Sequence, residues 1–305
     1  MTSVVFPGQG SQFVEMAKDF NDNFKLSKQI FEEIEDLVKI DIRNIIFNNH
    51  ENKLNLTQYT QICIFSCSYI IFKTYLNEKN KKIDDFNVML GHSLGEYTAL
   101  ACSNKISLDE CCRILKKRGE LMNDAIPPNE TSMAALIGRN SDHVFKIIKD
   151  NDLNIQIAND NSPFQIVISG TKNEILNSKN FFLDNGIKKF IELNVSAAFH
   201  SNFMINAQEK LSKEIDKINF IENDIQIISN YDATINKDTK SIKNKLQKQM
   251  ANKVNWTQSI KNLEGIGENK IIEIGPNKIL SGLISRISKN FDIVTINQVS
   301  DLYEQ

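Results

Sequence analysis

A serine stands between two glycines in the segment GHSLG, residues 91–95, a pattern typical of a serine nucleophile. The preceding residues 86–90, FNVML, predict a buried strand, and the residues that follow predict a helix. In that context the segment forms a sharp turn that projects the hydroxyl from the sheet. The helix N-terminus favours developing negative charge beside Ser93, and the backbone N–H of Leu94 is the natural first oxyanion donor. Ser93 could instead only cap the helix, but the strand and both glycines favour the nucleophile.

A serine hydroxyl needs a base, and the chain has four histidines. His50 lies in a polar run and is expected to be exposed. His92 adjoins the nucleophile on a turn that directs its side chain away from Ser93, and His143 lies on the polar side of a predicted helix. His200 remains, in a loop of small residues between a predicted strand and a helix. On the residues alone, His200 could equally make a structural hydrogen bond near a helix N-terminus.

The elements that must position these residues alternate between short strands and helices. Residues 3–6 predict a strand, residues 54–75 a long apolar helix and residues 108–122 an amphipathic helix. This rhythm is typical of an α/β fold, in which helices cover a mostly parallel sheet. We therefore expect a large α/β-hydrolase-like domain around the GHSLG segment.

A different order of elements begins after a proline-containing break, DAIPPNET at 124–131. A strand, a helix, two strands, a helix and a strand follow, and this β-α-β-β-α-β order is typical of a ferredoxin-like α+β unit. We predict that residues 126–196 form a small inserted subdomain. Residues 1–125 and 197–305 would together form the large catalytic domain.

Composition excludes several classes of protein. The 305 residues are 41% hydrophobic and 24% charged, as in globular proteins, and 36 Lys and Arg against 38 Asp and Glu give no positive field for nucleic acid. The five cysteines lie mostly in helical stretches without a ligand cluster, which predicts reduced thiols and no metal site. No apolar run approaches the roughly 18 residues of a membrane span, and no signal peptide is evident. We expect a cytoplasmic protein, or one from an equivalent reducing compartment, and a monomer.

Six blocks of sequence resemble the malonyl-CoA:acyl carrier protein transacylase family, in that family's order and over essentially the whole chain. The blocks are FPGQGSQ at 6–12, GHSLGEYTAL at 91–100, KKRGELM at 116–122, ANDNSPFQIVISG at 158–170, VSAAFHS at 195–201 and EIGPNKILSGL at 273–283. The resemblance implies that Ser93 is the acylated nucleophile and His200 its general base. It also implies that Gln9 lies beside the oxyanion hole.

The resemblance further implies that Arg118 binds the malonyl carboxylate, which a guanidinium can hold through two charge-assisted bonds. On the residues alone, an exposed basic helix face is the favoured alternative, because Lys116 and Lys117 precede it. Phe199 resembles the residue that favours malonyl over branched acyl groups in related acyltransferases, although it could simply pack in the core. Gln249, in a helix predicted around residues 242–250, matches a glutamine whose main-chain carbonyl orients the histidine.

One residue departs from the family pattern. Lys253 stands where the family usually has proline, which puts the local backbone around Gln249 in doubt. The expected reaction is a ping-pong transfer of malonyl from malonyl-CoA to acyl carrier protein, with no metal or redox cofactor. The carrier protein is acidic, so it would dock on a basic patch, for which local clustering suggests four lysines. These are Lys116, Lys117, Lys188 and Lys189.

Two alternatives remain open. A hydrolase with the same Ser–His pair would need a buried carboxylate to orient the imidazole, and Asp184 and Glu192 precede the histidine but fall inside the predicted inserted subdomain. A non-catalytic scaffold is the second alternative, and it would have no use for a nucleophile, a base and an arginine kept together.

Overall fold

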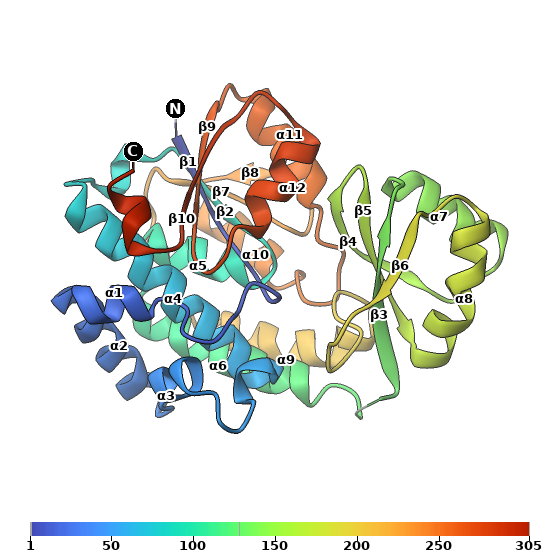
Figure 1. Cartoon of the computed structure of the whole chain (residues 1–305), viewed down its shortest axis with the longest axis horizontal. Coiled ribbons are helices and arrows are strands. Elements are labelled where there is room, and N and C mark those ends of the chain that lie inside the picture. Colours follow the sequence, from blue (N-terminus) through green and yellow to red (C-terminus); the bar gives the residue numbers. More distant parts are fainter. Residues whose placement is uncertain (1, 128, 305) are drawn as a thin grey trace.

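The computed structural model describes residues 2–127 and 129–304, and it contains two sheets with helices packed on them (Figure 1). Residue 128, in the expected proline-containing break, lies outside the described residues, as do residues 1 and 305 of the expected large domain. The larger sheet has the strand order β10-β9-β1-β2-β7-β8. Its neighbouring strands are parallel except for the pair β7 and β8. The expected mostly parallel α/β sheet is therefore confirmed.

The bounds of the elements in this larger part are as follows. Its strands are β1 (Thr2–Phe6), β2 (Val88–Gly91), β7 (Gln226–Ile228), β8 (Ile235–Asn236), β9 (Lys270–Ile274) and β10 (Asp292–Ile296). Its helices are α1 (Lys18–Asn23), α2 (Lys25–Val38), α3 (Ile42–Phe47), α4 (Thr57–Glu78), α5 (Leu94–Cys102), α6 (Leu108–Asn123), α9 (Ile205–Ile215), α10 (Thr239–Leu246), α11 (Trp256–Gly265) and α12 (Ile279–Ile287). Short 3₁₀ turns lie at Lys53–Asn55, Ile83–Asp85, Asn202–Met204 and Val299–Leu302.

Alternating side chains of β1 enter two different cores. Val4 and Phe6 pack with α4, α5 and α6 on one face of the sheet, and Val5 packs with α11 and α12 on the other. Helix α4 is buried almost all round, as expected for a helix enclosed between the sheet and other helices. This central burial confirms the long apolar helix expected at 54–75, although it begins at Thr57 and ends at Glu78.

The smaller sheet has the ferredoxin-like strand order β4-β5-β3-β6, and every neighbouring pair is antiparallel. Its elements are β3 (Thr131–Ile137), α7 (Ser141–Asp150), β4 (Gln156–Ser162), β5 (Gln165–Thr171), α8 (Lys172–Asp184) and β6 (Lys189–Glu192). This arrangement confirms the expected fold class of an α/β domain with a small α+β subdomain. The domain boundaries at 126 and 196 stay a prediction.

Alternate side chains of β3 pack in the cores of the small and the large part. Ala134 and Leu136 pack under α7 and α8, which cover the outer side of the small sheet (Figure 1). Met133 and Ala135 point the opposite way and join the core of the large part. Strand β4 also bonds the large part through its backbone. The Val254 N–H donates to the Ala158 carbonyl, and the Asp160 N–H donates to the Val254 carbonyl. The small sheet is thus positioned to line a cavity against the large one.

No helix in the described part of the chain is both long enough and apolar enough to cross a bilayer.

Candidate active site

Ser93 lies on a sharp turn between β2 and α5, with the strained backbone angles φ 53° and ψ −104°. A Cβ at Gly91 would lie 2.0 Å from the carbonyl carbon of Gly95, and a Cβ at Gly95 would lie 2.1 Å from the carbonyl oxygen of Phe6. Both positions therefore need glycine. Ser93 occupies the N-cap position of α5, yet its side chain makes no capping hydrogen bond. The hydroxyl is left for other partners.

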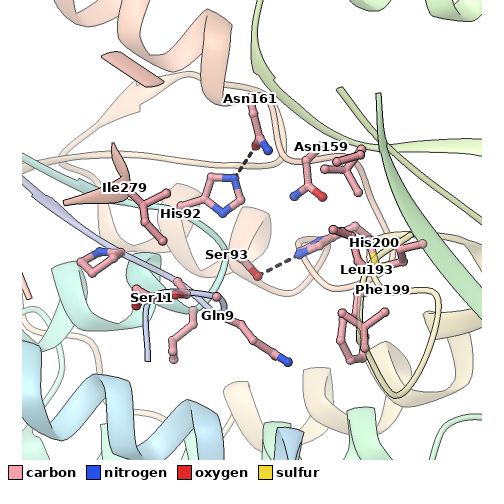
Figure 2. A pocket seen from close by; sticks show the side chains of 18 of the residues that line it. Gln9, Ser11, His92, Ser93, Asn159, Asn161, Leu193, Phe199, His200 and Ile279 are labelled. Carbon is pink, nitrogen blue, oxygen red and sulfur yellow. Dashed lines mark hydrogen bonds between the residues drawn. The ribbon is translucent and has the colours of Figure 1, made fainter. Parts of the chain in front are cut away.

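The Ser93 hydroxyl contacts His200, with Oγ 2.8 Å from Nε2 (Figure 2). The other ring nitrogen, Nδ1, lies 3.1 Å from the carbonyl oxygens of Gln249 and Asn252. A carbonyl can only accept, so Nδ1 must carry the proton and Nε2 is left as the acceptor for the serine proton. This geometry is that of a nucleophile and its base.

The surroundings of His200 keep its ring uncharged. Burial is the largest cause that lowers the pKa of His200, to about 3, and the nearby charge of Arg118 and the His92 ring add to it. The two carbonyls at Nδ1 act in the opposite direction. At neutral pH the imidazole is therefore ready to take a proton.

Arg118 of α6 is buried, with 1% of its surface exposed. Its Nη2 donates to Ser93 Oγ and to Gln249 Oε1, at 3.1 Å each, and its Nη1 donates to Gln61 Oε1. Its Nε makes no hydrogen bond within the described part of the chain. An exposed basic face, favoured on the residues alone, is therefore wrong for this arginine, although its neighbour Lys117 is exposed.

Gln249 joins the groups of the site through both its main chain and its side chain. Its carbonyl accepts from His200, as the family resemblance implies, and Lys253 does not prevent this contact. Its side-chain Nε2 donates to the Ser93 carbonyl and to Glu96 Oε2, at 2.8 Å each. The helix expected over 242–250 is wrong at its end, because α10 stops at Leu246. Beyond the helix the Gln249 carbonyl needs no intrahelical partner and can turn to the histidine.

Gln9 and Leu94 line the same cavity as Ser93. Leu94 is the first residue of α5, so its backbone N–H has no intrahelical acceptor and can face an oxyanion. The Gln9 side chain donates to Thr57 Oγ1 at 3.3 Å, so its side-chain amide already has a partner.

The cavity has a volume of about 410 Å³ and lies between the two sheets. Many of the residues that line it are apolar, among them the buried Phe199, whose role in acyl selectivity stays a prediction. Asn159 and Asn161 of β4 also line the cavity. Figure 2 shows His92 turned toward Asn161, whose Oδ1 lies 2.7 Å from Nε2, rather than toward Ser93. His92 therefore points away from the nucleophile, as expected.

The remaining histidines and the carboxylates weighed as partners lie elsewhere. His50 is exposed, and His143 contacts the carbonyl of Asn185 in the small subdomain. Asp184 and Glu192 are exposed on the same subdomain. The described contacts of His200 Nδ1 are thus two carbonyls and no carboxylate.

Several residues of the site were not predicted from the sequence, among them Gln61, Glu96 and Asn230. Gln61 and Glu96 are polar residues inside apolar helical stretches, and that contrast was a usable signal. Asn230 lies in a polar loop and gave no signal, although its side chain bonds the turn at Ser93. Among the described residues no group of three or more His, Cys, Asp or Glu could hold a metal ion.

Comparison with known proteins places these features in a family. A family model described as Acyl transferase domain matches residues 4–298. The malonyl CoA-acyl carrier protein transacylase of Bacillus subtilis (strain 168) is 34% identical over 297 residues, which cover 96% of this chain and 92% of that protein. The protein of that name from Staphylococcus aureus (strain MRSA252) is 34% identical over 304 residues, covering 99% of this chain and 97% of that protein.

Solved structures agree with the sequence comparison. An acyl carrier protein S-malonyltransferase from Vibrio cholerae superposes with a TM-score of 0.93 at 32% identity, covering 99% of this chain and 98% of that chain. A malonyl-transacylase in complex with a type II PKS acyl-carrier protein gives a TM-score of 0.94 at 30% identity, covering 99% of this chain and 97% of that chain.

Proposed function

Because this chain belongs to the acyl transferase family, we propose that it moves a malonyl group from malonyl-CoA to the phosphopantetheine thiol of acyl carrier protein. This reaction would supply the extender unit for fatty acid synthesis. The observation that carries the proposal is the contact of Ser93 Oγ with His200 Nε2 at 2.8 Å, beside a buried Arg118. One cavity is thus lined by a nucleophile (Ser93), a neutral base (His200) and a buried cation (Arg118).

In the first half-reaction, His200 takes the proton of Ser93 as Oγ attacks the thioester carbonyl carbon. The oxyanion that forms lies near the N–H of Leu94 and a donor at Gln9. The tetrahedral intermediate collapses, the C–S bond breaks, and the histidine returns the proton to the sulfur of coenzyme A. In the second half-reaction the carrier-protein thiol attacks the malonyl-serine, and the proton passes back through the histidine to Ser93.

Arg118 fits a substrate with a carboxylate at the end of its acyl group. Its guanidinium already reaches Ser93 Oγ, so a short diacid attached there would lie within its range. The unpaired Nε is a donor that such a carboxylate can use together with Nη2. A buried guanidinium without an anion is costly, so binding a carboxylate would relieve that cost.

A hydrolase would make the same acyl-serine but pass it to water. The carbonyl partners of His200 argue against the Ser-His-Asp arrangement that such hydrolases usually have.

The surface that docks the carrier protein is a separate proposal. Lys117, Lys188 and Lys189 are exposed and can meet an acidic carrier protein, while Lys116 already donates to the Val38 carbonyl. The docking lysines and the monomeric state stay predictions, and five buried free cysteines fit a reducing compartment such as the cytoplasm.

The test follows the acyl group by intact-mass spectrometry. We expect malonyl-CoA to add one malonyl group to the wild type and none to Ser93→Ala, which lacks the nucleophile. Holo acyl carrier protein should then remove the adduct and gain the same mass. An adduct that survives in Ser93→Ala would contradict the assignment of the nucleophile. Release of free malonate faster than transfer, with carrier protein present, would favour the hydrolase.

A further inference from the structure

The parallel ladder between β2 and β7 ends just before the nucleophile. Val88 and Met89 pair with Gln226 and Ile227, and β7 itself ends at Ile228. On the opposite side, β1 still accompanies the chain, because the N–H of His92 donates to the Phe6 carbonyl at 3.0 Å. Since successive residues of a strand face opposite neighbours, the Gly91 carbonyl and the Ser93 N–H point to the side that β7 has left.

The side chain of Asn230 fills this gap. Its Nδ2 donates to the Gly91 carbonyl at 2.7 Å, and its Oδ1 accepts from the Ser93 N–H at 2.6 Å. In a parallel ladder, one residue of the neighbouring strand donates to one carbonyl and accepts from the N–H two residues further on. The primary amide of Asn230 makes the same pair of bonds on either side of His92. It therefore takes the place of a strand residue that the backbone no longer supplies.

We propose that Asn230 is a positioning residue that holds the turn at Ser93 in its reactive conformation, an inference that rests on the proposed function. The turn needs such support because a φ of 53° with a ψ of −104° lies outside the regions that residues with a Cβ favour. By occupying the Ser93 N–H, the amide also leaves the N–H of Leu94 as the donor of this turn that can face an oxyanion.

Asn230 can hold the turn at Ser93 in place because it is buried and its own backbone is held by hydrogen bonds. It is 1% exposed, its N–H donates to Glu96 Oε2 at 3.1 Å, and its carbonyl accepts from the Asn255 backbone N–H at 3.0 Å. A side chain with this little freedom transmits its geometry to the groups it bonds.

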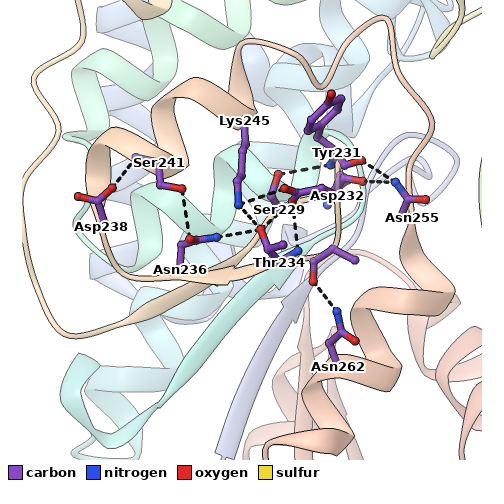
Figure 3. A network of polar contacts seen from close by, with 12 residues as sticks. Ser229, Tyr231, Asp232, Thr234, Asn236, Asp238, Ser241, Lys245, Asn255 and Asn262 are labelled. Carbon is purple, nitrogen blue, oxygen red and sulfur yellow. Dashed lines mark hydrogen bonds and ion pairs between the residues drawn. The ribbon is translucent and has the colours of Figure 1, made fainter.

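The turn that carries Asn230 is held by a second set of polar contacts, shown in Figure 3. Asn255 Nδ2 donates to the Tyr231 carbonyl at 2.7 Å, and Asn262 Nδ2 donates to the Ala233 carbonyl at 2.8 Å. Lys245 forms an ion pair with Asp232 at 3.1 Å. None of these contacts reaches the nucleophile turn. Asn262 therefore offers a matched control, an asparagine that braces the same turn without touching Ser93.

The first experiment compares Asn230→Ala with Asn262→Ala. Ser93 acylation by malonyl-CoA is followed by rapid quench and intact mass, and each rate is normalised to the fraction of folded enzyme. We expect Asn230→Ala to acylate about 10²-fold more slowly at little-changed KM, because a small misplacement of a reacting group costs that much. Asn262→Ala should stay within about threefold of the wild type, because it weakens only the supporting turn.

The second variant, Asn230→Asp, separates positioning from a merely structural role. A protonated carboxyl can donate to the Gly91 carbonyl and accept from the Ser93 N–H, whereas a carboxylate can only accept. The titratable group in contact with Asn230 is Glu96, whose Oε2 accepts from the Asn230 N–H, while Arg118 and His200 contact the Ser93 hydroxyl; all three residues are present in both proteins. Burial of this position raises the pKa of a carboxyl placed there, so the acylation rate of the variant, relative to the wild type, should rise at least about tenfold from pH 8 to pH 5.5, since the missing donor returns.

The outcomes distinguish this inference from the proposed function. Equal slowing in Asn230→Ala and Asn262→Ala, or an Asn230→Asp rate that keeps a constant ratio to the wild type at all pH values, would overturn the positioning role alone. A wild type that acquires no malonyl group would overturn the proposed function and, with it, this inference. Slow acylation in Asn230→Ala together with acid rescue in Asn230→Asp supports both.

Discussion

At the scale of single residues, two neighbouring buried side chains, Arg118 and His200, must both carry a positive charge at one stage of the proposed reaction. In the proposed reaction Arg118 must stay charged to hold a carboxylate, and that charge helps lower the pKa of His200 to about 3, after the larger effect of burial. An imidazolium must nevertheless form while the proton is in transit. A malonyl carboxylate paired with the guanidinium would offset the repulsion at that moment. The substrate would thereby help the base, which an acyl group without a carboxylate could not do.

We predict that Arg118→Ala loses its selectivity for malonyl-CoA. The variant should lose about 10²-fold in kcat/KM for malonyl-CoA, because a buried charge-assisted contact of roughly 3 kcal/mol is removed. Acetyl-CoA carries no carboxylate and should be used about as well as by the wild type, or better. A panel of malonyl-, methylmalonyl- and acetyl-CoA measures the change in selectivity.

The matched control for this panel is Arg118→Lys, which keeps the charge but not the two-pronged geometry. Its selectivity should fall between those of the wild type and Arg118→Ala. Equal loss toward malonyl-CoA and acetyl-CoA in both variants would mean that Arg118 serves Ser93 rather than the carboxylate.

The sequence predicted some of these residues and missed others for a physical reason. The pattern around Ser93 is local, and the family resemblance pointed to His200, so both could be named without coordinates. Glu96 and Asn230 act through contacts with segments more than a hundred residues away. No local pattern encodes such a meeting, because it depends on how separate elements pack.

At the scale of elements, a glycine lets two helices approach where the site needs them. Gly119 follows Arg118 on α6, and a Cβ there would lie 2.9 Å from the carbonyl oxygen of Gln58 on α4. The same close approach brings Arg118 against Gln61, one turn further along α4. The spacing of these two helices therefore sets where the guanidinium lies.

We predict opposite effects for two glycine-to-alanine changes inside helices. Gly119→Ala should lower the free energy of unfolding by about 1–3 kcal/mol, because the Gln58 backbone must move away. It should also raise the KM for malonyl-CoA, since α6 shifts with Arg118. Gly282→Ala on α12 meets nothing within 4 Å and should raise the free energy of unfolding by up to about 1 kcal/mol, through helix propensity alone. Urea denaturation and steady-state kinetics measure both effects, and a Gly119→Ala protein as stable as Gly282→Ala would contradict the crowding argument.

Element order was easier to predict than element ends. Alternation of strands and helices indicated both sheets, because it follows from hydrophobic periodicity along the chain. The end of α10 was not predictable in this way. Apolar spacing continues from Ile242 through Leu246 to Met250, and both outer residues are buried although the helix stops between them. The hydrogen bond from His200 Nδ1 to the Gln249 carbonyl is a tertiary contact, which hydrophobic periodicity cannot predict.

At the scale of the whole molecule, the two sheets share one cavity and one core. Met133 of the small sheet packs in the core of the large part, and His92 of the nucleophile turn bonds Asn161 of β4. Thr257 of α11 donates to the carboxylate of Asp160 across the same boundary. The order of strands and helices predicted that both parts exist, but only the packing shows that residues of both line the cavity.

Burying ionisable groups in this shared core makes global stability depend on pH, with opposite signs for two groups. His200 has a lowered pKa of about 3, so the unfolded chain binds its proton more readily, and stability rises with pH up to the ordinary value of 6.5. Glu96 has a pKa raised to about 7, chiefly by burial and against its bonds from Gln249 and Asn230. Its folded form keeps a proton that the unfolded chain has lost, so stability falls as pH rises from 4.5 to 7.

Glu96→Gln should isolate the second contribution. Its amide oxygen can still accept from the Asn230 N–H and the Gln249 side chain, but it cannot ionise. The free energy of unfolding of the variant, minus that of the wild type, should therefore increase by roughly 3 kcal/mol between pH 4.5 and pH 8. The contribution of His200 is common to both proteins and cancels. Urea titrations at pH 4.5, 6 and 8 measure this difference, and a value independent of pH would mean that Glu96 ionises in the folded protein as easily as in the unfolded chain.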